Sequence, residues 1–168
     1  MIRAEQAGDS EAIYRVNAIA FGRHHEANLV NRLRGLPKSL SLVALADDAI
    51  VGPICFSPVT IQTVATAPGL ILGLGPVAVL PEHQRQGIGS QLIGQGLKDC
   101  TLAGGQAVVV LGDPAFYARF GFIPAAQKQL RCEYTVPDGA FRVLELQSGA
   151  LEGCQGLVQY RPEFADCA

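Results

Sequence analysis

The first part of the chain carries apolar residues at helical spacing, which predicts two helices. One face of residues 10–20 is apolar at steps of three and four residues, formed by Ala12, Ile13, Val16, Ile19 and Ala20. Asp9 or Ser10 suits the N-cap of this helix, and a short strand is expected before it at Ile2–Ala4. A second helix is predicted over residues 25–34, with Gly35 and Pro37 ending it.

Between residues 40 and 80 the pattern changes to runs that are typical of strands. Strands are expected at residues 40–46, 50–61 and 70–80, joined by turns at residues 47–48 and 66–69, so the region is predicted to be a three-stranded meander. Pro53 and Pro58 interrupt the second strand. Because proline cannot donate a ladder hydrogen bond, we expect these two positions to be irregular or to lie at an edge.

After residue 90 a helical stripe returns, followed by strands around one short helix. The stripe consists of Leu92, Ile93, Leu97, Cys100 and Ala103, and Gly104-Gly105 ends it. Gly94 and Gly96 each weaken this helix by about 1 kcal/mol relative to alanine, but their small size would let it lie close to the sheet. Further elements are expected as a strand at 107–111, a short helix at 115–119 with Asp113 as N-cap and Pro114 after it, and strands at 120–123, 142–146 and 156–160. Residues 1–168 are thus predicted to form a single α/β domain.

Composition narrows the possible partners and the compartment. The chain is 49% hydrophobic and 17% charged with a net charge of −2, and it has no run of Lys or Arg, so neither nucleic acid nor an acidic membrane is expected as a partner. The five cysteines form no C-x-x-C pair, which argues against a disulfide framework and against a zinc site. The N-terminus lacks an apolar signal segment, and the apolar stretch near residues 69–80 is too short to span a bilayer. We therefore expect a cytoplasmic protein, either a monomer or a homodimer.

A glycine-rich turn follows the third predicted strand and opens a helix. Gly87 and Gly89 come directly before the helical stripe. The first amides of a helix have no internal partner and lie at the positive end of the helix dipole, so phosphate oxygens could bind there if no side chain blocks them. The lysine of a P-loop is missing, and the preceding strands do not provide the context of a Rossmann fingerprint. From this turn alone, a phosphate site and a tight turn that packs on the sheet both remain possible.

A second candidate lies in the segment LGDPAFYARFGF, residues 111–122. Tyr117 is expected on the short helix, where Phe116, Phe120 and Phe122 could supply an apolar wall. A phenol in such a place can give a proton to a leaving group of similar basicity. The alternative is a core tyrosine whose hydroxyl is bonded to the backbone.

Together the two segments resemble the GNAT superfamily of acetyl-CoA-dependent N-acetyltransferases, most closely its YhbS-like group. The resemblance is carried by VAVLPEHQRQGIGSQL, in which Gln84, Gly87 and Gly89 match the Q/R-x-x-G-x-G/A signature, and by YARFGF, in which Tyr117 stands at the usual general-acid position. It implies a mixed, mostly antiparallel central sheet that is splayed at the cofactor site and flanked by helices. It covers nearly the whole chain.

The resemblance also implies a site and a reaction. Acetyl-CoA would lie between the strand that ends at Val79 and the strand that ends at Leu111. The pantetheine arm would bond to the backbone of Val77 and Val79, and an amide near Val79 would stabilise the oxyanion. A neutral amine would attack directly, Tyr117 would protonate the CoA thiolate, and no metal would be needed. The implied cofactor-binding residues are Val77, Ala78, Val79, Gln84, Arg85, Gln86, Gly87, Ile88, Gly89 and Ser90.

Three positions depart from the family pattern, and the general base is left open. Val110 stands where an Asn is common, Gln84 replaces the commoner Arg, and Pro53 perturbs a strand that would face the acceptor. His24, His25 and Glu26 lie in the acceptor region, but each is also an ordinary surface residue, so none is assigned as the base. The alternatives to an N-acetyltransferase are a non-catalytic acyl-CoA-binding sensor or interaction module, and a nucleotide-dependent oxidoreductase, which the missing Rossmann context disfavours.

Overall fold

The computed structural model describes residues 1–63 and 68–167, and the chain falls into two compact units. Unit 1 is made of the described residues within 1–57, 75–98 and 162–167, and unit 2 of those within 58–74 and 99–161. The strands β3 and β4 and the helix α3 contribute residues to both units. Thr66 and Ala67 of the predicted turn at 66–69 lie outside the described residues, and the single domain over residues 1–168 stays a prediction.

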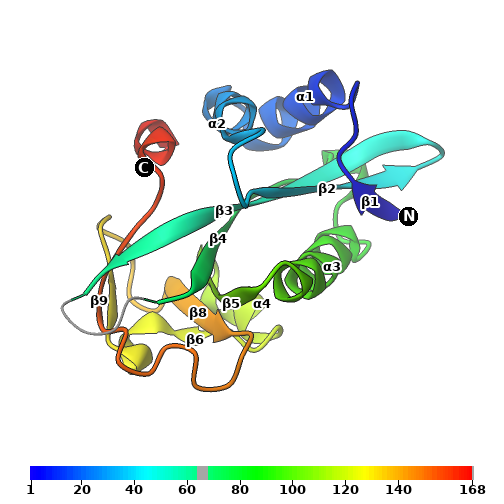
Figure 1. Ribbon diagram of the computed structural model, residues 1–168. Coiled ribbons are helices and arrows are strands. Elements are labelled where there is room, and N and C mark those ends of the chain that lie inside the picture. Colours follow the sequence, from blue (N-terminus) through cyan, green and yellow to red (C-terminus); the bar gives the residue numbers. More distant parts are fainter. Residues whose placement is uncertain (64–67, 168) are drawn as a thin grey trace. The chain divides into compact units, whose positions relative to one another are not determined.

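Unit 1 consists of strands covered by helices (Figure 1). Its elements are β1 (Ile2–Ala4), α1 (Ser10–Phe21), α2 (His25–Leu33), β2 (Leu40–Ala46), the first part of β3 (Ala49–Gln62), the end of β4 (Leu70–Val77), the short 3₁₀ helix η1 (Pro81–His83), most of α3 (Ile88–Leu102) and the 3₁₀ helix η3 (Pro162–Cys167). The strands β1 and β2 are antiparallel, as are β2 and β3. The apolar spacing of the first forty residues therefore predicted both N-terminal helices, and the range expected for α2 differs from the observed one by a single residue.

Two neighbouring residues of β3 show how the helices of unit 1 cover both faces of its strands. Successive side chains of a strand point to opposite faces. The Cys55 side chain packs against Leu29 and Leu33 of α2, whereas Phe56 lies directly under Gly96 of α3. Accordingly, α2 lies on one face and α3 on the other, as Figure 1 shows.

Unit 2 contains most of β4 and the elements that follow α3. These are β5 (Gly105–Leu111), α4 (Pro114–Ala118), β6 (Ile123–Pro124), η2 (Ala125–Lys128), β7 (Leu130–Cys132), β8 (Phe141–Glu145) and β9 (Gly156–Gln159). The strands β4 and β5 are parallel, with Leu74 opposite Val110, whereas β8 is antiparallel to both β5 and β6. The strands expected at 142–146 and 156–160 correspond to β8 and β9, and the strand expected at 120–123 reaches β6 only at Ile123. The three-residue strand β7 has too few residues to show a period.

The strands follow the order β1-β2-β3-β4-β5-β8-β6 in a nine-stranded sheet, and β9 pairs with both β3 and β7. Most of the pairs are antiparallel, while β4–β5 and β7–β9 are parallel. This mixed, mostly antiparallel sheet with flanking helices confirms the fold class expected from the sequence.

The two prolines of β3 behave differently. Pro58 falls between the stretch that pairs with β2, which ends at Phe56, and the stretch that pairs with β9, which begins at Thr60, so neither ladder needs its amide. Pro53 is not at an edge: it is buried, lies opposite Val43, and its carbonyl accepts a hydrogen bond from Ala78 N at 3.1 Å. Of the two alternatives expected for Pro53, the edge position is wrong, because a proline still offers its carbonyl to a neighbouring segment. The other alternative, an irregular strand, agrees with the shift in the β2–β3 register between Ala44 and Leu45, beside Gly52.

Three local expectations need correction. Asp9 does not cap α1 with its side chain, since its carboxylate binds Arg3 and the amide of Gln6 instead. The strand predicted at 70–80 ends at Val77. The strand predicted at 120–123 begins only at Ile123, because Phe120 N still bonds to Tyr117 O at 3.0 Å and so continues the turn after α4.

Two further expectations concern disulfide bonds and membrane-spanning helices. The five cysteines, all within the described residues, are thiols and form no disulfide. Across residues 1–63 and 68–167, none of the helices has the length and apolar character to cross a membrane.

The contact between α3 and β3 can be tested with two glycines of the same helix. A methyl group at Gly96 would collide with the Phe56 ring, which is fully buried, whereas one at Gly94 would meet nothing within 4 Å. We expect Gly96→Ala to lower the free energy of unfolding by about 1–3 kcal/mol through overpacking. Gly94→Ala should raise it by up to about 1 kcal/mol through helix propensity. Urea denaturation of both variants measures this, and equal effects would contradict the close packing of α3 on Phe56.

Candidate active site

In unit 1, the chain from Val77 to Leu80 continues alongside β3 after β4 has ended. Ala78 N donates to Pro53 O at 3.1 Å and Leu80 N donates to Val51 O at 2.9 Å. Because backbone groups of an extended chain point alternately to its two sides, the amides of Val77 and Val79 point away from β3. The side chains alternate too, since Ala78 and Leu80 are buried while Val77 and Val79 are half-buried. A ligand that pairs like a strand could therefore approach this side of the chain, where the amide of Val79 donates to no described residue.

The glycine-rich turn that follows presents a row of backbone amides. In the part of the chain that the structure describes, none of the N–H groups from Arg85 to Ser90 donates a hydrogen bond, and the first bond of α3 runs from Gln91 N to Gly87 O at 3.0 Å. Gly87 has φ +84°, a left-handed conformation that favours glycine, and Arg85 has φ +62°. These donors lie at the positive end of a 15-residue helix. The turn can therefore accept an anionic group with several oxygens.

Two glutamine side chains hold the turn in place. Gln84 Nε2 donates to Val79 O at 2.9 Å, and Gln86 Nε2 donates to Glu82 O at 3.4 Å. Gln84 therefore ties the turn to the end of the preceding strand, and the exposed Arg85 is left as the cationic side chain of this segment. The structure thus places the ten predicted cofactor-binding residues on one continuous stretch of unit 1.

Tyr117 belongs to unit 2, on α4, and its ring is buried among aromatic side chains. Asp113 caps this helix by accepting from Ala115 N at 3.1 Å, with Pro114 in the first turn, as the sequence predicted. The ring stands edge-on to Phe116 and Phe122, with centroids 5.1 and 5.7 Å away. Phe120 packs on Phe116 instead. The expected apolar wall therefore consists of two of the three phenylalanines.

The Tyr117 hydroxyl is kept protonated and has no internal partner. Tyr117 is 7% exposed, and burial raises its pKa to about 12. Among the described residues no group forms a hydrogen bond with this hydroxyl. A core tyrosine is normally bonded to a backbone group, and no such bond is found for Tyr117 among the described residues, so Tyr117 stays a candidate general acid.

Gly112 is a residue of this site that the sequence analysis missed. A Cβ at Gly112 would collide with the Tyr117 ring, the two nearest atoms being Cε2 and Cδ2. The glycine thus leaves the space that the ring occupies. Its position between β5 and the cap Asp113 could have suggested a close approach, but the sequence does not show which side chain approaches.

Val110 occupies the position at which the family commonly has an asparagine, and its side chain is apolar. Val110 is 1% exposed and lies between Leu74 of β4 and Arg142 of β8. It offers no side-chain hydrogen bond to a ligand.

Two of the three residues weighed as a general base, Glu26 and His24, are engaged with neighbours. Glu26 forms an ion pair with Arg23, with Nε to Oε1 at 3.0 Å. Burial acts to raise the pKa of Glu26, but the hydrogen bonds and the charge of Arg23 outweigh it and lower that pKa, which makes this carboxylate a weak base. His24 shares a hydrogen bond of 3.0 Å with Tyr14 and stacks on its ring. Within residues 1–63 and 68–167 no cluster of His, Cys, Asp or Glu could hold a metal ion.

The role of Gly112 can be tested by adding the missing methyl group. We expect Gly112→Ala to displace the Tyr117 ring and to lower the free energy of unfolding by about 1–3 kcal/mol. Aromatic NMR signals of Tyr117 and urea denaturation measure the two effects. The matched control repeats the substitution in a Tyr117→Ala background, where the cost should largely vanish; an equal cost in both backgrounds would show that the ring is not what the methyl group meets.

Known proteins of similar sequence and structure belong to the family whose motifs the glycine-rich turn and the Tyr117 segment resemble. Residues 37–124 match the family model of the acetyltransferase (GNAT) domain. The chain is 39% identical over 167 residues to the uncharacterised N-acetyltransferase YhbS of Escherichia coli, covering 98% of each protein. The crystal structure of that protein in complex with CoA is similar with a TM-score of 0.90, covering 98% of this chain and 91% of that one. A GNAT family acetyltransferase from Brucella melitensis in complex with acetyl-CoA is 36% identical with a TM-score of 0.78, covering 98% and 97%.

The family model covers more than half of the chain, and the identity to YhbS extends over nearly all of it. The mixed, mostly antiparallel sheet and the glycine-rich turn before α3 are those that the resemblance implied. This chain belongs to the GNAT family of N-acetyltransferases.

Proposed function

We propose that this chain transfers the acetyl group of acetyl-CoA to a primary amine of a small molecule or a protein. The observation that carries the proposal is the row of unused amides from Arg85 to Ser90 at the start of α3. Two relatives that cover almost the whole chain are similar in structure, and they contain CoA and acetyl-CoA.

The cofactor would be held mainly by backbone groups of unit 1. The amides from Arg85 to Ser90 would bind the pyrophosphate, with Gly87 and Gly89 leaving room for its oxygens. Val77 and Val79 would bond to the pantetheine arm on the side that β3 does not use. The charge of Arg85 and the bracing by Gln84 support this arrangement, because a turn held in advance loses less entropy when the ligand binds.

The chemistry needs one electrophile, one acid and an unprotonated amine. Acetyl-CoA supplies the activated acyl group as a thioester. An amide near Val79 would polarise the carbonyl and stabilise the oxyanion formed when the amine nitrogen attacks. The C–N bond forms, the C–S bond breaks, Tyr117 gives its proton to the departing sulfur, and the amine loses a proton to water.

The pKa of Tyr117 suits this role if the leaving thiolate is also shielded from water. An exposed thiolate, with a pKa near 8.5, would be too weak a base to take a proton from this phenol. Burial raises thiol pKa values as well, and it brings those of Cys55 and Cys100 of this chain to about 12. A thiolate that is shielded from water would therefore be a stronger base than an exposed one, which favours proton transfer from Tyr117.

The apolar Val110 favours one alternative, an acyl-CoA-binding sensor without chemistry. The two functions are separated by calorimetry with acetyl-CoA followed by an amine panel in which released CoA is measured. No binding of acetyl-CoA would end both proposals, and binding without release of CoA across the panel would support the sensor.

The cofactor site is tested by Gly89→Ala. A methyl group at Gly89 has room in the protein alone, its nearest neighbour being Val79 Cγ2 at 3.9 Å, so folding should be unaffected. The same methyl group would obstruct the pyrophosphate, and we expect acetyl-CoA affinity to fall about tenfold or more, equivalent to about 1.4 kcal/mol. Calorimetry measures this, with Gly94→Ala as the control on the same helix. Unchanged affinity in Gly89→Ala would place the pyrophosphate elsewhere.

The acid role is tested by Tyr117→Phe. This substitution keeps the buried ring and removes the proton, so kcat should fall about a hundredfold or more while acetyl-CoA affinity stays the same. Steady-state kinetics and calorimetry measure the two quantities. Tyr134→Phe, in a tyrosine that stacks on Tyr160 in the same unit, is the matched control. Full activity of Tyr117→Phe would remove Tyr117 from the mechanism.

A further inference from the structure

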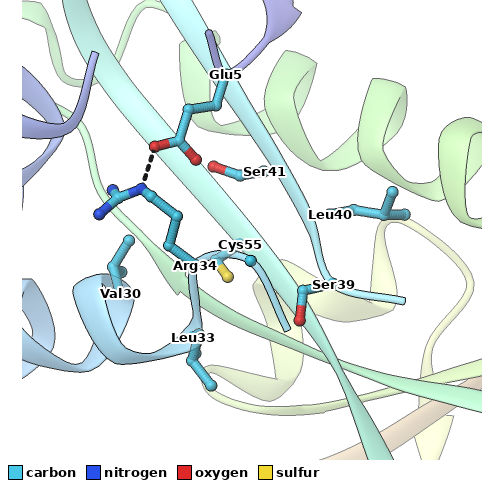
Figure 2. A pocket seen from close by; sticks show the side chains of 9 residues that line it. Glu5, Val30, Leu33, Arg34, Ser39, Leu40, Ser41 and Cys55 are labelled. Carbon is cyan, nitrogen blue, oxygen red and sulfur yellow. Dashed lines mark hydrogen bonds and ion pairs between the residues drawn. The ribbon is translucent and has the colours of Figure 1, made fainter. Parts of the chain in front are cut away.

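Unit 1 contains a cavity that shares no residue with the proposed cofactor site. Its volume is about 200 Å³, and it lies between α2, the start of β2 and β3 (Figure 2). Val30, Leu33 and Cys55 form an apolar part of its wall. The polar part is formed by Glu5, Arg34 and two serines, Ser39 and Ser41. At about 30 Å³ for each water molecule, the space corresponds to about six waters or to one small organic molecule.

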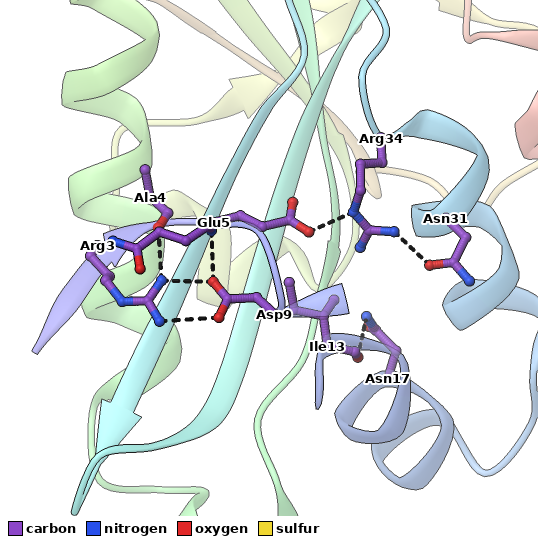
Figure 3. A network of polar contacts seen from close by, with 9 residues as sticks. Arg3, Ala4, Glu5, Asp9, Ile13, Asn17, Asn31 and Arg34 are labelled. Atoms are coloured by element: carbon purple, nitrogen blue, oxygen red, sulfur yellow. Dashed lines mark hydrogen bonds and ion pairs between the residues drawn. The ribbon is translucent and has the colours of Figure 1, made fainter. Parts of the chain in front are cut away.

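An ion pair on the wall is held in place by a wider network. Arg34 Nε donates to Glu5 Oε1 at 2.5 Å, and Arg34 Nη1 donates to Asn31 Oδ1 at 2.7 Å. The segment that carries Glu5 is fixed in turn by Asp9, which accepts from Arg3 Nη1 and from Gln6 N, both at 2.7 Å (Figure 3). The ion pair is thus a preformed part of the cavity.

Three polar atoms beside this cavity are left without a partner. They are Arg34 Nη2, Ser39 Oγ and Ser41 Oγ, each shut off from solvent and without a hydrogen bond to any described residue. Figure 2 shows the Ser41 hydroxyl pointing toward the Glu5 carboxylate. A buried polar group without a partner destabilises the fold, because it has lost its hydrogen bonds to water. Since a serine hydroxyl can turn by rotation about χ1, a molecule in the cavity could satisfy all three groups at once.

The charges around the cavity select the ligand. Glu5 and Arg34 cancel, and the C-terminal end of α2, which carries partial negative charge, lies beside Arg34. An anion would face Glu5 and this helix end, and a cation would meet the guanidinium. We propose that the cavity binds a small uncharged molecule whose hydroxyl or carbonyl oxygens accept from Arg34 Nη2 and from the two serines.

Three probes of similar size but different charge test this in the full-length protein. Glycerol is neutral, glycerate is an anion and aminopropanediol is a cation. The backbone amide NMR signals of Gly35, Ser39 and Ser41 are followed as each probe is added. We expect saturable shifts with glycerol, at an affinity about tenfold or more above that for either charged probe, because the charged probes lose solvation without gaining an ion pair. Shifts that do not saturate with any probe, which would indicate a cavity that holds only water, or tighter binding of a charged probe, would overturn the proposal.

Serine variants test whether the hydroxyl groups without partners take part in glycerol binding. The double variant Ser39→Ala/Ser41→Ala removes two hydroxyls and should weaken glycerol binding about tenfold, the effect of two ordinary hydrogen bonds. Ser57→Ala is the matched control, because Ser57 is fully buried on β3 with an unpartnered hydroxyl but does not line the cavity. If the double variant is poorly folded by circular dichroism, Ser41→Ala alone is used. Glycerol affinity that is equal in the wild type and the serine variants would refute the assigned site.

Discussion

After β4 the chain lies close to the middle of β3, and the proposed cofactor site of unit 1 depends on this contact. Ala78 and Leu80 direct their amides to the carbonyls of Pro53 and Val51, and Gly52 lies so close that a Cβ there would be 2.9 Å from Ala78 O. With alternate amides used in this way, those of Val77 and Val79 must point to the other side. The same contact sets the direction in which the chain enters the glycine-rich turn.

Burial is the corresponding constraint in unit 2. The Tyr117 ring occupies the space left by Gly112 and is enclosed by Phe116 and Phe122, and the same enclosure holds its pKa near 12. The same aromatic enclosure therefore fixes the position of the Tyr117 ring and raises the pKa of its hydroxyl. A phenol with the ordinary pKa of about 10 is already protonated at neutral pH, and desolvation disfavours the Tyr117 phenolate further.

Much of the fold could be predicted from the sequence, because helices and strands of useful length repeat their apolar residues with a fixed period. The ends of α2, β2 and β3 were predicted within one residue. Periodicity does not set the start of β6, which has only two residues, and it does not show the surroundings of Pro53, whose carbonyl accepts from Ala78, twenty-five residues further along the chain. In the candidate site, Gly87, Gly89 and Tyr117 were found by motif. Gly112, Gly52 and the Glu5–Arg34 cavity were missed because their partners are distant in the chain or give no pattern.

The sequence by itself determined the order of the elements, the glycine-rich opening of α3, the capped helix that carries Tyr117 and the resemblance to the GNAT family. These features depend on neighbouring residues, whose spacing and backbone preferences can be read along the chain. Only the tertiary structure decided which amides stay unused, how deeply the phenol is buried and where three polar atoms are left without partners. Those properties are set by solvent exclusion and by hydrogen bonds between segments that meet only after folding.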